Sequence, residues 1–167
     1  MDGYLFDTNT LSALLDPSHS KHADASAAVA ALDSAAPKFV SVVALAELQF
    51  GKLLVEAFAG STPARLTLII SRAQTYAPLE ITRHTVAEYG ELKANLAKLY
   101  LAKAFARDRP RWLENWVDQA TGQRLQVDEN DLWMCAQARE RNLVMLTADR
   151  KMDRIARADP LVRLSFI

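Results

Sequence analysis

The chain has 167 residues, half of them apolar, and its twenty basic side chains balance its twenty acidic ones. That length and balance fit one ordinary globular domain with a real core. Zero net charge argues against a protein that coats nucleic acid tightly, and the single cysteine, Cys135, excludes an internal disulfide framework. No apolar run approaches the roughly 20 residues that span a bilayer, and the acidic N-terminus is unlike a signal peptide. We therefore expect a cytoplasmic protein with no membrane attachment.

Short apolar runs alternate with longer helical stretches in the first half of the chain. Runs of four or five mostly apolar residues predict buried strands, and apolar residues spaced three or four apart predict the helices between them. We predict strands over 4–7, 39–42 and 77–81, and helices over 9–16, 22–34, about 43–58 and 62–76.

The second half continues this alternation, apart from one irregular stretch. We predict helices over 82–103, 132–141 and 149–158, a strand over 143–146 and an edge strand over 161–166. Residues 104–127 fit neither pattern and indicate an insertion, partly helical around 113–120. No stretch has the composition of a linker, so we predict one domain over residues 1–167.

Alternating strands and helices predict a central parallel β-sheet flanked by helices, which is an open α/β fold. Sites in such sheets form at the carboxyl ends of the strands. Asp7 and Asp149 follow predicted strands directly, and Glu47 lies on the helix after the second strand. We therefore expect these side chains to share a site.

Four acidic residues carry most of the chemical information: Asp7, Glu47, Asp131 and Asp149. Two follow apolar strands, and the other two lie in line with apolar residues on predicted helices. Carboxylates are costly to bury unless they are paired or hold a metal. Four of them together would form a site for Mg²⁺ or Mn²⁺, as in an enzyme that cleaves phosphodiester bonds.

Each of the two strand-ending acids also has an ordinary structural explanation. Asp7 could merely precede a helix that Thr8 or Asn9 caps, and Asp149 could cap the helix that follows it. Neither residue taken alone distinguishes a site from a helix start.

The two acids on predicted helices differ in how easily they are explained. Asp131 could belong to a capping box with Asp128. Glu47 is harder to explain, because no arginine lies nearby in the sequence and it shares a helix face with Val43, Phe50 and Leu54. Ordinary explanations holding for all four acids, on consecutive elements of an α/β pattern, are less plausible than a shared site.

Other residues have simpler roles. We expect Cys135 to be a packed thiol and Asp153 to be an exposed partner of Arg157. Three tryptophans could stack on nucleic-acid bases, although packing or an interface is their commoner fate; they are Trp112, Trp116 and Trp133.

Positive charge concentrates in residues 98–111 and 139–163, whereas the first 60 residues carry seven acids and three lysines. A basic rim around an acidic site could hold a phosphate backbone. Solvated helix faces explain the same pattern, and charge alone favours that explanation.

Four motifs in order resemble the PIN-domain family, and most of all its VapC-type ribonuclease toxins from prokaryotic toxin–antitoxin modules. They are Leu-Phe-Asp-Thr-Asn at the start, Val-Ser-Val-Val-Ala-Leu-Ala-Glu-Leu around Glu47, Glu-Asn-Asp-Leu-Trp-Met-Cys-Ala around Asp131 and Leu-Thr-Ala-Asp ending at Asp149. The resemblance runs from Tyr4 to about Ile155. Any one motif is weak, but the ordered set is fairly specific.

The resemblance implies a PIN-like parallel-sheet fold and Mg²⁺-dependent RNA cleavage, with Mn²⁺ able to substitute. It also implies a homodimer and a small antitoxin protein that blocks the acidic site. The family's acidic positions carry over to Asp7, Glu47, Asp131 and Asp149, with Thr8 and Thr147 as supporting polar groups. The insertion at 104–127 departs from the compact toxins and leaves substrate choice and dimer geometry open.

Three other functions compete with a toxin nuclease. A phosphoaspartyl phosphotransferase could use Asp7 as nucleophile, but Asp-Thr-Asn-Thr lacks the second aspartate expected two residues later in haloacid-dehalogenase-like enzymes. A non-catalytic RNA-binding or interaction module could use the same fold without the chemistry. A PIN nuclease of RNA processing would share the chemistry without being a toxin.

Overall fold

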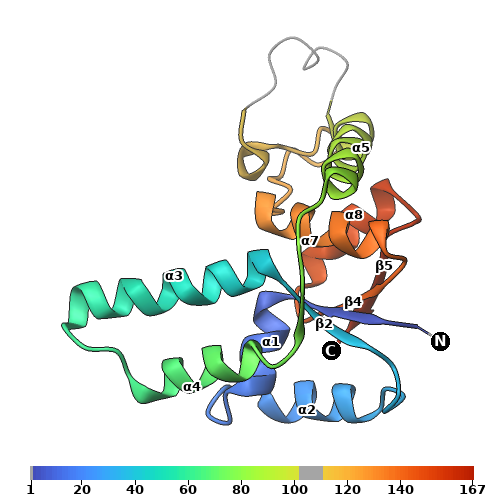
Figure 1. The fold of residues 1–167 in the computed structure, drawn as a ribbon. Helices are drawn as coiled ribbons and strands as arrows, with labels where there is room; N and C mark the ends of the chain where they lie inside the picture. The colour runs from blue at the N-terminus through green and yellow to red at the C-terminus, as the bar shows by residue number, and fades with distance from the viewer. Residues whose placement is uncertain (1, 102–110) are drawn as a thin grey trace.

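The computed structural model describes residues 2–101 and 111–167 (Figure 1). In this part of the chain five strands form one sheet, and every pairing in it is parallel. The strands are β1 (Tyr4–Phe6), β2 (Lys38–Ser41), β3 (Ala77–Leu79), β4 (Val144–Thr147) and β5 (Arg163–Phe166). The predicted α/β class with a central parallel sheet is confirmed.

Helices cover this sheet on both sides. Figure 1 shows α5, α7 and α8 above the strands, with α1 and α2 below them and α3 extending away over α4. The helices are α1 (Thr8–Leu15), α2 (His22–Ala30), α3 (Val42–Ala59), α4 (Ala64–Ala73), α5 (Arg83–Tyr100), α7 (Glu129–Glu140) and α8 (Asp153–Ala158), and two 3-10 turns are η1 (Leu113–Asn115) and η2 (Arg150–Met152).

The order of strands in space creates a crevice beside β1. The order is β3-β2-β1-β4-β5, so the chain builds outward from β1 in one direction and then crosses to the other side of β1 for β4. Phe6 pairs with Val40 of β2 and with Leu146 of β4. All three strands therefore end at the same edge, and ligands of open α/β sheets bind at such a switch in strand order.

The strands form because their residues are buried on both faces of the sheet. Leu5, Phe6, Val40 and Met145 are fully buried, which is the environment that favours continuous apolar runs in parallel sheets. The Phe6 ring packs edge-on against Tyr76, which immediately precedes β3. This core holds the ends of β1, β2 and β4 in fixed register.

Helix α7 begins three residues before the predicted start of 132. Asp128 is its N-cap and accepts from the backbone N–H of Asp131, whose carboxylate in turn accepts from the backbone N–H of Asp128 in a capping box. Residues 128–131 are polar and show no apolar periodicity, yet they begin a helix, because the capping box satisfies backbone N–H groups at its start. The predicted helix over 149–158 is likewise divided, into η2 and α8.

The described part of the irregular stretch folds onto the core. Leu113, Trp116 and Leu125 are buried, but only η1 is helical, so the predicted helix around 113–120 was wrong beyond Asn115. The chain turns back instead, with a bridge between Val117 and Arg124. Residues 102–110, which include the first part of the predicted insertion and the last two residues of the predicted helix over 82–103, lie outside the described residues. The insertion at 104–127 and the single domain over 1–167 stay predictions.

Two smaller expectations can be compared with the structure. Cys135 is fully buried and its Sγ lies 3.7 Å from Sδ of Met145, as a packed thiol should. Among residues 2–101 and 111–167, no helix is long and apolar enough to cross a membrane.

Candidate active site

The four acids singled out in the sequence line one pocket. It has a volume of about 240 Å³ and lies where β1 and β4 end and α3 and α7 begin. Its lining residues are Asp7, Thr8, Asn9, Glu47, Asp128, Asp131, Met134 and Asp149. Residues from four separate parts of the sequence are thus brought together at the crevice beside β1.

Asp7 is the most deeply placed of these acids, with only 2% of its surface exposed. It is itself the N-cap of α1 and accepts a hydrogen bond from the backbone N–H of Thr10 at 2.5 Å, so the alternative in which Thr8 or Asn9 caps this helix was wrong. An aspartate with extended backbone at a helix start is an effective cap. The cap fixes one carboxylate oxygen and turns the side chain toward the strand ends.

Thr147, the last residue of β4, joins two of the acids. Its hydroxyl donates to Oδ2 of Asp7 at 2.6 Å and accepts from the backbone N–H of Asp149 at 2.9 Å. Asp149 caps the η2 turn through its Oδ1, which accepts from Lys151 N–H. Asp149 therefore caps a turn, as the structural explanation expected, and it also lines the pocket.

Glu47 is held by two neutral donors rather than by an arginine. Thr8 donates its hydroxyl hydrogen to Oε2, and Asn130 donates to Oε1 at 2.8 Å. The apolar stripe expected around Glu47 is not buried, because Phe50 is 65% and Leu54 44% exposed. Glu47 is therefore half-buried near the protein surface, and its carboxylate oxygens accept hydrogen bonds instead of forming an ion pair.

Burial and mutual repulsion raise the proton affinity of the deeper carboxylates. Burial, and next the charge of Asp128, raise the pKa of Asp131 to about 7, and the charges of Asp149 and Asp7 act in the same direction. Burial also raises the pKa of Asp7, although hydrogen bonds from Thr10 and Thr147 oppose this and the Asp149 charge adds to it. Carboxylates that repel one another in this way attract a cation.

Gln137 fixes the position of α7 over the sheet edge. Its side chain is fully buried, accepts a hydrogen bond from the Ser41 hydroxyl at 2.5 Å and donates to the backbone oxygen of Leu79 at 2.8 Å. These bonds join α7 to the last residues of β2 and β3. They place Asp131, less than two turns earlier on α7, above the end of β1.

The oxygen-only donor set suits a hard divalent cation such as Mg²⁺. Within the described residues, however, no three acidic, histidine or cysteine side chains are close enough together to hold one ion by themselves. Mg²⁺ commonly uses one or two carboxylates and completes its shell with water and substrate phosphate. The pocket fits this open kind of site and does not fit a closed protein cage.

Most of the basic side chains of residues 139–163 form ion pairs with acidic side chains of the same chain. Arg139 pairs with Glu88, Glu91 and Asp159, which ties α7 to α5 and to the segment after α8. Other pairs join Arg141 to Glu140, Arg157 to Asp153 and Arg163 to Asp2. The Asp153 pairing confirms that residue as an exposed partner of Arg157. Lys103, Arg107 and Arg109 of the other basic stretch lie outside the described residues.

Sequence reasoning missed one polar residue of the site and gave two others only a capping role. Asn130 was not identified, and Asn9 and Asp128 were considered only as caps. Both asparagines lie within the quoted motifs, next to Thr8 and Asp131. Their signal was therefore adjacency to residues already singled out, whereas the bond from Asn130 to Glu47 depends on how α3 and α7 pack.

Comparison with solved structures shows the same fold over almost the whole chain. VapBC2 from Rickettsia felis bound to promoter DNA matches with 19% identity and a TM-score of 0.65, covering 98% of this chain and 97% of that chain. DNA-bound VapBC from Salmonella typhimurium matches with 18% identity and a TM-score of 0.62, covering 99% of this chain and 98% of that chain. VapBC-5 from Mycobacterium tuberculosis matches with 22% identity and a TM-score of 0.57, covering 100% of this chain and 98% of that chain.

Sequence comparisons give the family. No curated protein matches the chain, but the family model described as PIN domain matches residues 4–158. PIN domains are typically nucleases, and PIN nucleases generally use a divalent metal. The matched residues span every strand of the sheet except β5 and all four acids of the pocket. The chain therefore belongs to the PIN domain family.

Proposed function

We propose that this protein is a Mg²⁺-dependent endoribonuclease and the toxin of a VapBC-type toxin–antitoxin system. One observation carries the proposal: Asp7, Glu47, Asp131 and Asp149 line a single pocket at the carboxyl edge of a parallel sheet. Membership of a family whose members are typically nucleases supports it. The three solved structures compared above, which have the same fold, are VapBC proteins, and this supports the toxin assignment.

Asp7 and Asp131 are the principal candidates to hold the cation. They are the two pocket acids whose pKa values are raised, chiefly by burial and also by neighbouring negative charge, and a bound cation would offset both effects. Bound there, a divalent cation would supply Lewis-acid stabilisation of charge on the phosphate oxygens. Mn²⁺ prefers the same oxygen ligands and would substitute.

Glu47 and Asp149 would complete the site and position the attacking water. Both oxygens of Glu47 already accept hydrogen bonds, so its orientation is set by Thr8 and Asn130. At Asp149, Oδ1 accepts from Lys151, whereas Oδ2 has no partner among the described residues. Asp149 Oδ2 is thus the atom best placed to accept a hydrogen bond from water.

Cationic groups border the acidic pocket on the Asp149 side. A neighbouring pocket of about 250 Å³ is lined by Asn9, His19, Lys21, Ala148 and Asp149. Lys21 could neutralise a phosphate of a bound nucleic-acid strand next to the reacting one. A neutral protein can therefore bind a polyanion locally, as the reaction requires.

We also propose a homodimer and a small antitoxin partner. Helices α3 and α4 carry large apolar side chains that are exposed in the single chain: Phe50, Leu53, Leu54, Phe58 and Leu68. Apolar groups gathered this densely on a surface usually mark an interface. An arginine on an antitoxin segment could pair with the pocket carboxylates and block the site.

The first test is cleavage of a mixed RNA pool and of single-stranded DNA by wild type and by Asp131→Asn, with Mg²⁺ or with EDTA. Asp153→Asn is the matched control, because Asp153 is an acid paired with Arg157 outside the pocket. We expect wild type and the control to cleave RNA only with metal, and Asp131→Asn to lose at least about 100-fold while staying folded.

Other results would point elsewhere. Equal activity in Asp131→Asn would overturn the assigned site, and cleavage with EDTA would overturn metal dependence. No cleavage together with no Mn²⁺ binding would indicate a non-catalytic interaction module. Cleavage of RNA that no co-expressed antitoxin inhibits would indicate an RNA-processing PIN nuclease.

A further inference from the structure

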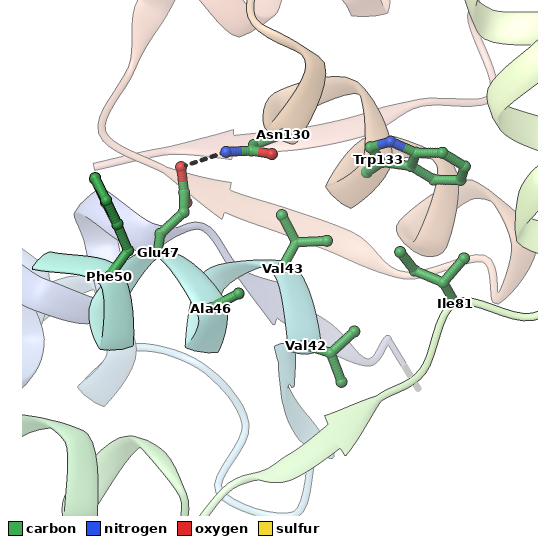
Figure 2. A pocket seen from close by; sticks show the side chains of 8 residues that line it. All are labelled: Val42, Val43, Ala46, Glu47, Phe50, Ile81, Asn130 and Trp133. Atoms are coloured by element: carbon green, nitrogen blue, oxygen red, sulfur yellow. Dashed lines mark hydrogen bonds between the residues drawn. The ribbon is translucent and has the colours of Figure 1, made fainter. Parts of the chain in front are cut away.

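A second pocket opens directly beside the carboxylates. It has a volume of about 540 Å³ and lies between the first turns of α3, the first turns of α7 and the end of β3 (Figure 2). Its lining residues are Val42, Val43, Ala46, Glu47, Phe50, Ile81, Asn130 and Trp133. Glu47 lines both pockets, so the apolar pocket adjoins the carboxylate pocket at this side chain.

Two polar side chains of α7 line this largely apolar space. Asn130 uses its amide nitrogen for Glu47, and neither its Oδ1 nor the indole N–H of Trp133 has a hydrogen-bond partner within the described residues. Asn130 and Trp133 are three residues apart on α7 and therefore share a face. Figure 2 shows both side chains along the upper rim of the pocket, above Val42, Val43 and Ala46. Among the described residues, the lining thus includes one side chain with an unpaired acceptor and one with an unpaired donor, above an apolar floor.

The indole is held in place from the side away from the pocket lining. The Tyr89 ring of α5 stacks on Trp133 with centroids 3.9 Å apart and planes 13° from parallel. The Tyr89 hydroxyl donates to Glu129 and accepts from Lys93 at 2.9 Å. A tryptophan fixed in this way is a rigid flat surface, so binding a ligand against it costs little further side-chain entropy.

We propose that this pocket binds the nucleobase of a nucleotide next to the cleaved phosphodiester bond, with Trp133 and Asn130 as specificity-determining residues. The inference rests on the proposed nuclease function and deepens it. A base is a flat apolar group with hydrogen-bonding edges, which matches an aromatic surface, an apolar floor and one donor–acceptor pair. A phosphate does not match, because the nearest charge, Glu47, is negative.

The position of the apolar pocket next to the carboxylates argues for a base as its occupant. In a nucleotide the base is joined to the phosphate through the ribose, so a phosphate among Asp7, Asp131 and Asp149 brings a base close to this site. The apolar pocket shares Glu47 with the carboxylate pocket and therefore lies next to it. The pocket that shares Asn9 and Asp149 with the carboxylate pocket holds Lys21 and His19, which suit the strand's backbone. The two flanking pockets therefore divide a bound strand into a base side and a phosphate side.

The test uses a short RNA that contains a cleavage site mapped from the pool, and copies in which one nucleotide beside that site lacks its base. Cleavage and binding are measured separately, the latter by fluorescence anisotropy of end-labelled RNA in EDTA. We expect Trp133→Ala to lower kcat/KM about 10-fold, chiefly through KM, since base–aromatic stacking is worth about 1–3 kcal/mol. Wild type should lose about as much on one abasic RNA, and Trp133→Ala should lose little more on that RNA.

Further variants separate this role from folding. Ala46→Phe fills the pocket from α3 without touching the Tyr89 stack and should weaken RNA binding as Trp133→Ala does. Trp133→Phe keeps a stacking surface and should recover most of the loss. Trp112→Ala is the matched control, because Trp112 is 53% exposed and does not line the pocket; it should behave as wild type.

The outcomes distinguish this inference from the proposed function. Base-dependent binding without cleavage would support the pocket and overturn the nuclease. Cleavage that is equally sensitive to Trp133→Ala on intact and abasic RNAs would overturn the pocket and leave the nuclease. If Ala46→Phe changes the oligomeric state in light scattering but not RNA binding, the pocket is a protein contact and the inference fails. Neither binding nor cleavage by folded wild type would overturn both.

Discussion

The Thr147 hydroxyl donates to Asp7 Oδ2 at 2.6 Å, joining the end of β4 to the end of β1. Both residues are almost completely buried. Because the same hydroxyl also accepts from Asp149 N–H, one side chain sets the spacing of two carboxylates. The geometry of the proposed active site thus depends on a residue that need not touch substrate.

Replacing Thr147 by valine should reduce both stability and activity. The change keeps the shape of the side chain but leaves Asp7 without one donor, so we expect the free energy of unfolding to fall by about 1–3 kcal/mol. A less firmly held Asp7 should lower kcat about 10-fold with a smaller change in KM. Denaturant unfolding and RNA cleavage measure the two effects. Thr147→Ser, which keeps the hydroxyl, should recover most of both; equal loss in the two variants would show that the methyl group, not the hydrogen bond, matters.

The metal-free protein should become less stable as pH rises toward neutrality. The pKa of Asp131 is about 7 in the folded chain, against an ordinary value of 3.8. Between these values the folded state keeps a proton that the unfolded state releases, so the free energy of unfolding falls with rising pH and levels off above about pH 7. The raised pKa of Asp7 acts in the same direction. Thermal unfolding in EDTA at about pH 5 and about pH 8 measures this difference.

Two comparisons assign this pH dependence to the pocket. Asp131→Asn should flatten the profile and unfold at a higher temperature than wild type near pH 8, because the buried charge is gone. Added Mg²⁺ should stabilise wild type more near pH 8 than near pH 5, since a ligand must be ionised to bind. A wild-type profile that rises over this range would contradict the placement of Asp131.

Charged substitutions on α3 should prevent self-association. Phe58 is 86% and Leu54 44% exposed in the single chain, so their burial is available to a second copy. Phe58→Asp together with Leu54→Asp should raise the dimer dissociation constant at least about 100-fold, as measured by light scattering over a concentration series. Leu161→Asp is the control, because Leu161 is 61% exposed but follows α8. A monomeric wild type, or a dimer that survives the double change, would argue against this face as the dimer interface.

The local pattern of the sequence was enough to predict the sheet and the four acids. Parallel strands buried on both faces require continuous apolar runs, and these runs marked β1, β2 and β4. Because such strands end at one edge, Asp7 and Asp149 could be expected to meet there. Caps were predicted unevenly. The capping box of Asp128 and Asp131 was considered from the sequence and is present, whereas α1 is capped by Asp7 and not by Thr8 or Asn9.

Only the tertiary structure decided how the acids are held and what lies beside them. Glu47 was expected to be buried in an apolar stripe, but α3 turns Phe50 outward, and the donors to Glu47 come from Thr8 and Asn130, 39 and 83 residues away. The apolar pocket next to Trp133 also exists only because α3 and α7 pack at this separation. Periodicity records which face of a helix is apolar, whereas the partner that the face meets is set by contacts between distant segments.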